Sequence, residues 1–347
     1  MKRTLFLLIL ASLVAAAGFS QADLQPAATV NLTKSEPITV KQLRTEVERM
    51  EKTAGRALTQ NERAQVLDVI INERLVIQAA ERDKVTVTEN EVNQQIQQLR
   101  GGMAQQIGRQ PTEAEFAQAV RNESGMELAA FREQLRRQLI IQKYLMTKKE
   151  NLINSIRAPT EEEVRAQYNL LRAQFVRPET VRFSMIQVSY GPDAASRTKA
   201  KTLADSLIKE IGSNPSKFDE VAARSQAPNS GFQAGDAGFM PRNMEAQSVV
   251  GQEFINIAFN LKQGEVSRLI EGAVGYQIIK VTENYAMKNL ELDDIFQLGT
   301  RSTVKDYIRQ VLLAERQQAI IAQASQELIS ELRTGKTFQI FEKNLTW

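Results

Sequence analysis

The stretch 254–281, FINIAFNLKQGEVSRLIEGAVGYQIIKV, decides the fold of the second half of the chain. Its apolar residues first follow helical spacing and then alternate with polar residues, as they do in half-buried strands. We therefore expect a helix over 252–261 and two strands, over 266–270 and 276–281. The polar Gln277 stands among the apolar residues of the last strand, so its role needs an explanation.

The residues before this stretch complete one compact α+β unit over 179–286. After Pro178 the periodicity changes from helical to alternating, which predicts a domain boundary near 178 and a strand over 181–189. The elements that follow are expected to be a helix over 194–212, a short helix over 218–225 and a Gly-rich loop over 229–239.

Five helix starts of one type lie before this unit. In each, a Thr is followed three residues later by Glu or Gln, so that each of the two side chains accepts a hydrogen bond from a free backbone N–H. The pairs are Thr39/Gln42, Thr59/Glu62, Thr88/Glu91, Thr112/Glu115 and Thr160/Glu163. The pattern predicts a helical domain over residues 23–178.

The helix that begins at Thr59 is the most apolar and is expected to be the central buried helix. Its apolar residues recur at three- and four-residue spacing: Val66, Val69, Ile70, Val76, Ile77 and Ala80. The pattern from Thr112 to Lys149 fits either one long helix or two helices broken near Gly125.

The two ends of the mature chain are expected to meet. A polar-faced helix over 303–333 is followed by an alternating strand over 337–347, and a second short strand lies over 28–33. Because neither strand can satisfy its backbone alone, we expect them to pair. Residues 287–347 would then pack on the helical domain.

Residues 1–22 have the pattern of a secretory signal peptide. Lys2 and Arg3 precede the apolar run LFLLILASLVAAAGF over 5–19, and small residues follow at the expected cleavage site. A membrane anchor is the alternative, although the run is short and Ala-rich for a span of ~20 strongly apolar residues. The mature chain is expected to be exported and to keep no stable anchor.

Composition excludes several classes of chemistry. The 347 residues contain no Cys and no His, so a His-assisted triad, a thiol protease and a Cys/His zinc site are impossible. The net charge is only +3, which argues against nucleic acid as a partner. No cofactor and no metal are expected.

Two further stretches carry a resemblance to a known family. FDEVAARSQAPNSGFQAGDAGF over 218–239, together with 254–281, resembles the parvulin-type PpiC domain, and VLDVIINERLVIQAAERDKVTVTENEVNQQIQQL over 66–99 resembles the N-terminal domain of the SurA/PrsA group of exported foldases. The resemblance implies an α+β fold class: a helical chaperone domain closed by the N- and C-terminal segments, with an inserted parvulin-like domain. It also implies a soluble periplasmic protein whose oligomeric state stays open.

The sequence departs from the family at three positions. Parvulins usually carry His where this chain has Met185 and Gln277, and Asp or Cys where it has Ala227. All three usual polar side chains of the site are therefore replaced, and no catalytic residue is identified. Gln277 either hydrogen-bonds a bound peptide or satisfies a structural group.

The family's proline pocket suggests which residues bind peptide. Phe254 matches an aromatic that floors this pocket, and the complete expected set is Met185, Met240, Val250, Phe254 and Gln277. A plain domain core is the alternative for the apolar members. Asp236 is expected to hold the Gly-rich turn through an Asx-type hydrogen bond.

Two main functions stay open, and a structural or adhesion role in the envelope is a third. Prolyl isomerisation rotates an amide through a barrier of ~18–20 kcal/mol and needs no nucleophile, so activity without His is physically possible. The first hypothesis is an ATP-independent chaperone that binds unfolded exported or outer-membrane polypeptides through shallow apolar surface on the helical domain, with a degenerate parvulin domain. The second is an active parvulin-type peptidyl-prolyl cis-trans isomerase.

Overall fold

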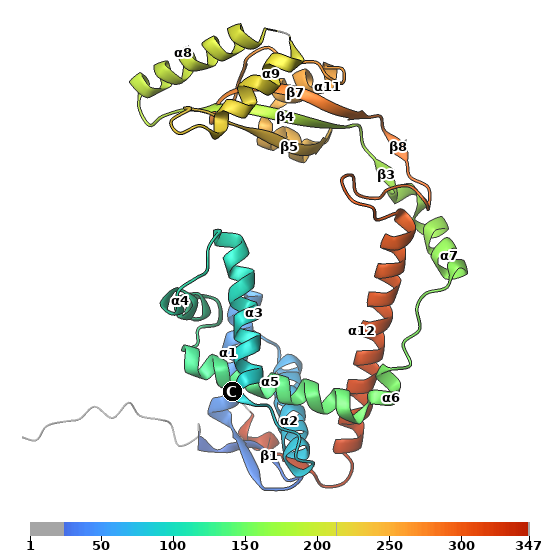
Figure 1. The fold of residues 1–347 in the computed structure, drawn as a ribbon. Helices are drawn as coiled ribbons and strands as arrows, with labels where there is room; N and C mark the ends of the chain where they lie inside the picture. Colours follow the sequence, from blue (N-terminus) through green and yellow to red (C-terminus); the bar gives the residue numbers. More distant parts are fainter. Residues whose placement is uncertain (1–23, 213, 346–347) are drawn as a thin grey trace, which may run out of the picture. The chain divides into compact units, whose positions relative to one another are not determined.

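The computed structural model describes residues 24–212 and 214–345 (Figure 1). The expected signal peptide over 1–22 lies outside the described residues, as do the last two residues of the expected C-terminal strand. The chain forms two compact units: unit 1 takes residues up to 156 and from 316 onward, and unit 2 takes residues 157–315. Within the described ranges, none of the helices is both long and apolar enough to cross a membrane.

Unit 1 combines a small sheet with a set of helices (Figure 1). Its elements are β1 (Pro26–Val30), β2 (Glu36–Thr39), α1 (Val40–Ala54), α2 (Gln60–Arg82), α3 (Glu89–Ile107), α4 (Glu113–Ser124), α5 (Leu128–Lys148), α6 (Glu150–Ile153), the second half of α12 (Val304–Leu332), β9 (Phe338–Ile340) and the turn η4 (Glu342–Asn344). The sheet order is β2-β1-β9, with Ala28 opposite Ile340. The expected pairing of the two chain ends is confirmed, and β2 is an additional strand.

The expected helix starts are confirmed in both units. At Thr39, Thr59, Thr88, Thr112 and Thr160, the Thr side chain accepts from the third helical N–H while the Glu or Gln side chain accepts from the Thr N–H. Gly125 ends α4 with φ 71°, a conformation that glycine adopts without steric cost. The pattern from Thr112 to Lys149 therefore forms two helices.

Helix α2 is the central helix of unit 1, as predicted. It buries Leu67, Ile71, Leu75 and Ala79 against α1, β1 and the C-terminal part of α12, which contributes Leu328 and Leu332. Within the expected apolar stripe, Val69 is the exception, because its side chain is exposed. The buried Gln78 connects α2 to the β1–β2 turn: its Oε1 accepts from the N–H groups of Thr33 and Lys34.

Unit 2 contains a four-stranded antiparallel sheet of order β5-β4-β7-β6. Its elements are α7 (Glu161–Leu171), η2 (Arg172–Gln174), β3 (Val176–Arg177), β4 (Thr180–Ser189), α8 (Ala194–Ile211), α9 (Pro215–Ala223), η3 (Arg224–Gln226), β5 (Gln233–Pro241), α10 (Met244–Val250), α11 (Gln252–Asn260), β6 (Ile270–Glu271), β7 (Gly275–Tyr285), β8 (Lys288–Asn289) and the first half of α12. Successive side chains of β4 point to opposite faces of the sheet. Ile186 packs on α8 and α9 on one face, and Phe183 packs on α11 on the other, so each face of the sheet has its own core.

The Gly-rich stretch 229–239 was expected to be a loop, and this expectation is wrong for most of it. Residues 233–241 form the edge strand β5, which pairs with β4. Gly and Asp are depleted from strands, which hides β5 in the sequence. The strand bulges at Gly238, φ 79°, and Asp236 accepts a 2.9 Å hydrogen bond from the Gly238 N–H. The Asx-type role predicted for Asp236 is confirmed.

The first boundary between the two compact units lies between residues 156 and 157, whereas the sequence predicted a domain boundary near 178. Helix α7 explains the difference, because its buried Val164 and Tyr168 pack on residues of unit 2 that precede and follow the four-stranded sheet in sequence. These partners are Phe175, Leu290, Val304 and Ile308. Of the segment 287–347, expected to pack on the helical domain, residues 287–315 therefore belong to unit 2.

Candidate functional site

The structure brings together four of the five residues expected to bind peptide. Met240 and Phe254 are buried in the core between the sheet and α11, and Met185 and Val250 pack at its partly exposed edge. Phe254 is only 2% exposed, and its ring centroid lies 5.5 Å from that of Phe183 at an interplanar angle of 60°. In this structure Phe254 is a core residue, and the edge is formed by Met185 and Val250.

Gln277 lies on the same sheet face as Met185. It pairs with Gln187, two residues beyond Met185 along β4, and both glutamines are half-buried. The Gln277 Oε1 lies 3.1 Å from the point where a Cβ on Gly272 would stand, so the absence of a side chain at Gly272 makes room for this amide. Within residues 24–212 and 214–345 the Gln277 amide makes no hydrogen bond to the protein.

Ala227 is not among the residues of the core cluster that contains Met185. It follows the turn η3, its side chain is exposed, and its N–H donates to the Arg224 carbonyl at 3.0 Å. Of the three positions at which the family usually carries polar groups, Met185 and Gln277 lie on one face of the sheet.

An ion-pair network occupies the bulge of β4 and β5. Arg182 donates to Asp236 at 2.5 Å and to Glu283 at 2.8 Å, and its guanidinium lies 5.1 Å from the centroid of the Phe239 ring. The hydrogen bonds from Arg182 and from the Gly238 N–H hold the pKa of the Asp236 carboxyl below its usual range. Asp236 is therefore ionised and paired at neutral pH, and it cannot serve as a general acid there.

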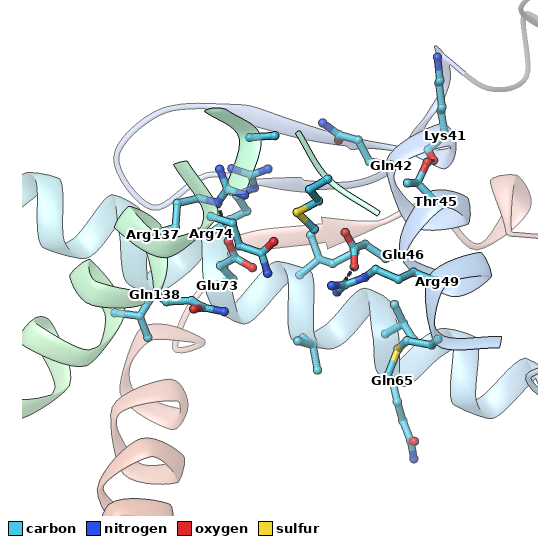
Figure 2. Close-up of a pocket in the computed structure, with 18 of the residues that line it drawn as sticks. Lys41, Gln42, Thr45, Glu46, Arg49, Gln65, Glu73, Arg74, Arg137 and Gln138 are labelled. Atoms are coloured by element: carbon cyan, nitrogen blue, oxygen red, sulfur yellow. Dashed lines mark hydrogen bonds and ion pairs between the residues drawn. The ribbon is translucent and has the colours of Figure 1, made fainter. Parts of the chain in front are cut away.

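A hollow lies in unit 1, in the helical part of the chain that was expected to bind clients, although no residue of it was named as a site. It is a groove of ≈ 870 Å³ between α1, α2 and α5 (Figure 2). Its apolar lining consists of Met50, Leu58, Val66, Val69, Ile70, Met126, Ala130 and Ile141. Charged and polar side chains form the rest of the lining, and Figure 2 shows them around the apolar floor.

The groove exposes apolar side chains that a folded domain normally buries. Val69 is 64% exposed and Met50 is 47% exposed. Charged neighbours on the rim are paired with each other: Arg49 with Glu46 at 2.6 Å, and Arg137 with Glu73 at 3.2 Å (Figure 2). The groove therefore offers an apolar surface framed by neutralised charges.

The sequence held one signal of this groove. Val69 belongs to the apolar stripe of α2, but it lies at the edge of the stripe, next to Asp68 and far from the positions that face the sheet.

A second depression, of ≈ 710 Å³, lies in unit 2 beside α11 and is lined mainly by polar residues such as Asn256 and Arg268. None of the five residues expected to bind peptide lines it.

Two family models match the chain. One, described as a SurA-like N-terminal domain, matches residues 1–145, and the other, described as a PPIC-type PPIase domain, matches residues 159–295. The Foldase protein PrsA of Clostridium botulinum (strain Loch Maree / Type A3) is 23% identical over 297 residues, which are 84% of this chain and 77% of that protein. The Chaperone SurA of Alcanivorax borkumensis is 28% identical over 285 residues, which are 79% of this chain and 58% of that protein.

Solved structures of related proteins also match. A SurA-like chaperone of Campylobacter jejuni aligns with a TM-score of 0.36 at 15% identity, covering 91% of this chain and 98% of that chain. PrsA from Bacillus subtilis aligns with a TM-score of 0.28 at 21% identity, covering 89% and 93%. The two domain matches follow one another along most of the sequence: a SurA-like N-terminal domain is followed by a PPIC-type PPIase domain, and the chain is similar over most of its length to proteins named PrsA and SurA.

Proposed function

We propose that this chain is an ATP-independent periplasmic chaperone that holds unfolded envelope proteins, outer-membrane proteins among them, in the groove of unit 1. The observation that carries the proposal is the open apolar floor of this groove, of which Val69 is the most exposed large apolar residue. Surface of this kind marks interaction sites, because leaving it in water costs free energy that a bound apolar segment recovers.

The chemistry of the groove suits many clients rather than one. Met50 and Met126 have flexible, polarisable side chains that adapt to different partners. The paired charges on the rim would tolerate a charged client segment better than a purely apolar surface would. Because these charges are already paired with each other, they would not select clients of one charge. Without ATP to drive release, each contact has to be weak and reversible.

The parvulin-like domain is proposed to contribute a weak peptide-binding edge. Met185, Val250 and Gln277 are the members of the expected set that are partly exposed, so a peptide would contact these first. Met240 and Phe254 support the edge from below. Exposed Met244 and Val249 on α10 extend the apolar surface beside Val250.

An active prolyl isomerase is the second candidate. The match to a PPIC-type PPIase domain over 159–295 favours it, as does the apolar cluster that could hold a proline ring in a dry site. Against it stand Met185, Ala227 and Gln277, and the ionised, paired state of Asp236.

Two assays on the chain 24–347 test these proposals. The first measures whether it suppresses aggregation of a urea-unfolded outer-membrane β-barrel on dilution, and the second measures cis-trans exchange of an Xaa-Pro peptide. Suppression without accelerated exchange is the expected result. Accelerated exchange without suppression would overturn the chaperone assignment in favour of the isomerase, and the absence of both would refute both.

A further inference from the structure

Two methionine side chains line the groove of unit 1 from different elements. Met50 lies in the C-terminal half of α1, and Met126 lies in the turn between α4 and α5. The side chain of Met50 is 47% exposed, and Met126 is half-buried. Thioether groups are therefore part of the surface that a client would contact, and Figure 2 shows sulfur atoms among the lining side chains.

An exposed thioether sulfur reacts with peroxides and hypohalous acids. In the reaction with hydrogen peroxide, the sulfur lone pair attacks one oxygen, an S–O bond forms and the O–O bond breaks. The second oxygen takes the proton of the first and leaves as water. The sulfur loses two electrons, which the peroxide gains, and the product is methionine sulfoxide. Because the chain contains no cysteine, no thiol of the chain competes with Met50 for the oxidant.

Oxidation of Met50 would change the polarity of the groove. The sulfoxide oxygen is a hydrogen-bond acceptor, so an apolar segment that covers it has to remove its water. The guanidinium groups that line the groove are already paired with carboxylates: Arg49 with Glu46 at 2.6 Å, Arg74 with Glu36 at 3.2 Å and Arg137 with Glu73 at 3.2 Å (Figure 2). A covered sulfoxide would therefore compete with a carboxylate for each of these donors.

We propose that Met50 is an oxidation site that switches the groove of unit 1: the thioether form binds apolar client segments, and the sulfoxide, formed by a peroxide or a hypohalous acid, weakens that binding. Met126 is a second, less accessible site of the same kind. Reduction by methionine sulfoxide reductases returns the binding form. The inference rests on the proposed chaperone function for its consequence, whereas the change in the groove surface does not depend on any client.

Met146 supplies a matched control, because it is 42% exposed on α5 in the same unit and is not among the residues that line the groove. The chain 24–347, M50L/M126L and M146L are each treated with hydrogen peroxide, which is then removed, and peptide mass spectrometry follows each methionine. Oxidation should raise the Kd for a urea-unfolded outer-membrane β-barrel about tenfold in the native chain and in M146L, and less than about twofold in M50L/M126L. Each variant is compared with itself before oxidation, so any effect of Leu on the starting affinity cancels.

The apolar dye bis-ANS gives a readout without a client. Its binding should fall on oxidation of the native chain and of M146L, change less in M50L/M126L, and recover after treatment with reductases for both sulfoxide epimers. Equal responses of the native chain and M50L/M126L would overturn the proposal. So would unchanged dye and client binding with position 50 fully oxidised, or a Met50 that stays reduced while Met146 reacts. If the unoxidised chain binds no client while the dye response depends on position 50, the chaperone function fails and the switch in the groove stands.

Discussion

Val66 and Val69 lie about one turn apart on α2, yet the side chain of Val66 is 6% exposed and that of Val69 is 64% exposed. Both line the groove between α1, α2 and α5. Val66 fixes the floor to the core of unit 1, and Val69 presents the same kind of side chain to whatever enters. This pair separates a residue that stabilises the fold from the residue that is proposed to contact a client.

Replacing Val69 by Asp should therefore weaken client holding without unfolding unit 1. A carboxylate on the floor of the groove has to lose water when an apolar segment binds, and we expect the apparent client Kd to rise about tenfold, or ~1.4 kcal/mol. Aggregation suppression of an unfolded β-barrel measures the effect. V274D makes the same change at similar exposure in unit 2 and should leave the Kd unchanged; equal losses in both variants would refute the assignment.

The parvulin-like domain should gain isomerase activity when its usual side chains return. In the variant M185H/Q277H, two imidazoles stand on one face of neighbouring strands, and we expect exchange of an Xaa-Pro peptide to be about tenfold faster than with the native chain. NMR exchange spectroscopy on the chain 24–347 measures both rates. Equal rates above that of the free peptide would mean that the present residues already catalyse, and a variant no faster than the free peptide would contradict the prediction.

The stability of unit 1 should fall in acid and stay constant near neutral pH. Hydrogen bonds from Arg56, Lys143 and Arg109 and from the Thr N–H groups lower the pKa values of Glu62, Glu91 and Glu115 to about 2, from 4.5 in the unfolded chain. Since the folded pKa values are the lower ones, the stabilisation is complete above pH 4.5 and is lost as the pH falls towards 2.

Helix α1 supplies the control for this pH dependence, because Gln42 fills the same capping position without titrating. The variant E62Q/E91Q/E115Q should be less stable than the native chain at pH 7, because the substitutions remove the ion pairs. Between pH 5 and pH 3 the variant should lose less stability than the native chain does. Urea midpoints at these three pH values measure the effect. Parallel pH curves for variant and native chain would show that these carboxylates do not govern the acid response.

The buried amide of Gln78 should be important for the β1–β2 turn. Gln78→Leu leaves the N–H groups of Thr33 and Lys34 without their acceptor, which should lower the free energy of unfolding by about 1–3 kcal/mol. Gln65→Ala, at an exposed position of the same helix, should cost less than about 0.5 kcal/mol. A loss at Gln78 no larger than at Gln65 would contradict the role of this contact.

Glycines in α3 and at the end of α1 should respond to Ala with opposite signs. Gly101 lies inside α3, and a Cβ there meets nothing within 4 Å, so Gly101→Ala should stabilise by about 0.5–1 kcal/mol. Gly55 ends α1 at φ 67°, where Ala is strained, so Gly55→Ala should destabilise by about 1 kcal/mol or more. Thermal unfolding of both variants checks the two signs, and equal signs would refute the helix assignment at one of them.

The sequence predicts features that depend on local interactions. The capping Thr residues and the break at Gly125 are local signals, because each is read from residues that touch within one turn. The pairing of β1 with β9 was also predictable, since neither short strand at the chain ends can satisfy its backbone alone.

The rest depends on contacts between distant residues. Strand β5 is composed of residues that strands usually avoid, and only its pairing with β4 makes it a strand. Helix α7 joins unit 2 through Phe175 and Leu290, which no local pattern reveals. The groove arises where three helices leave Val69 uncovered.

The most direct test of the account is photo-crosslinking from within the groove. A benzoylphenylalanine at position 69 of the chain 24–347, exposed to a urea-unfolded outer-membrane β-barrel and then illuminated, should form a covalent adduct with the client. The same residue at position 274 should form little. Two results would contradict the claim that unit 1 holds the client in this groove. One is an adduct at position 274 that equals or exceeds the adduct at position 69. The other is no adduct at position 69 under conditions in which the chain suppresses aggregation.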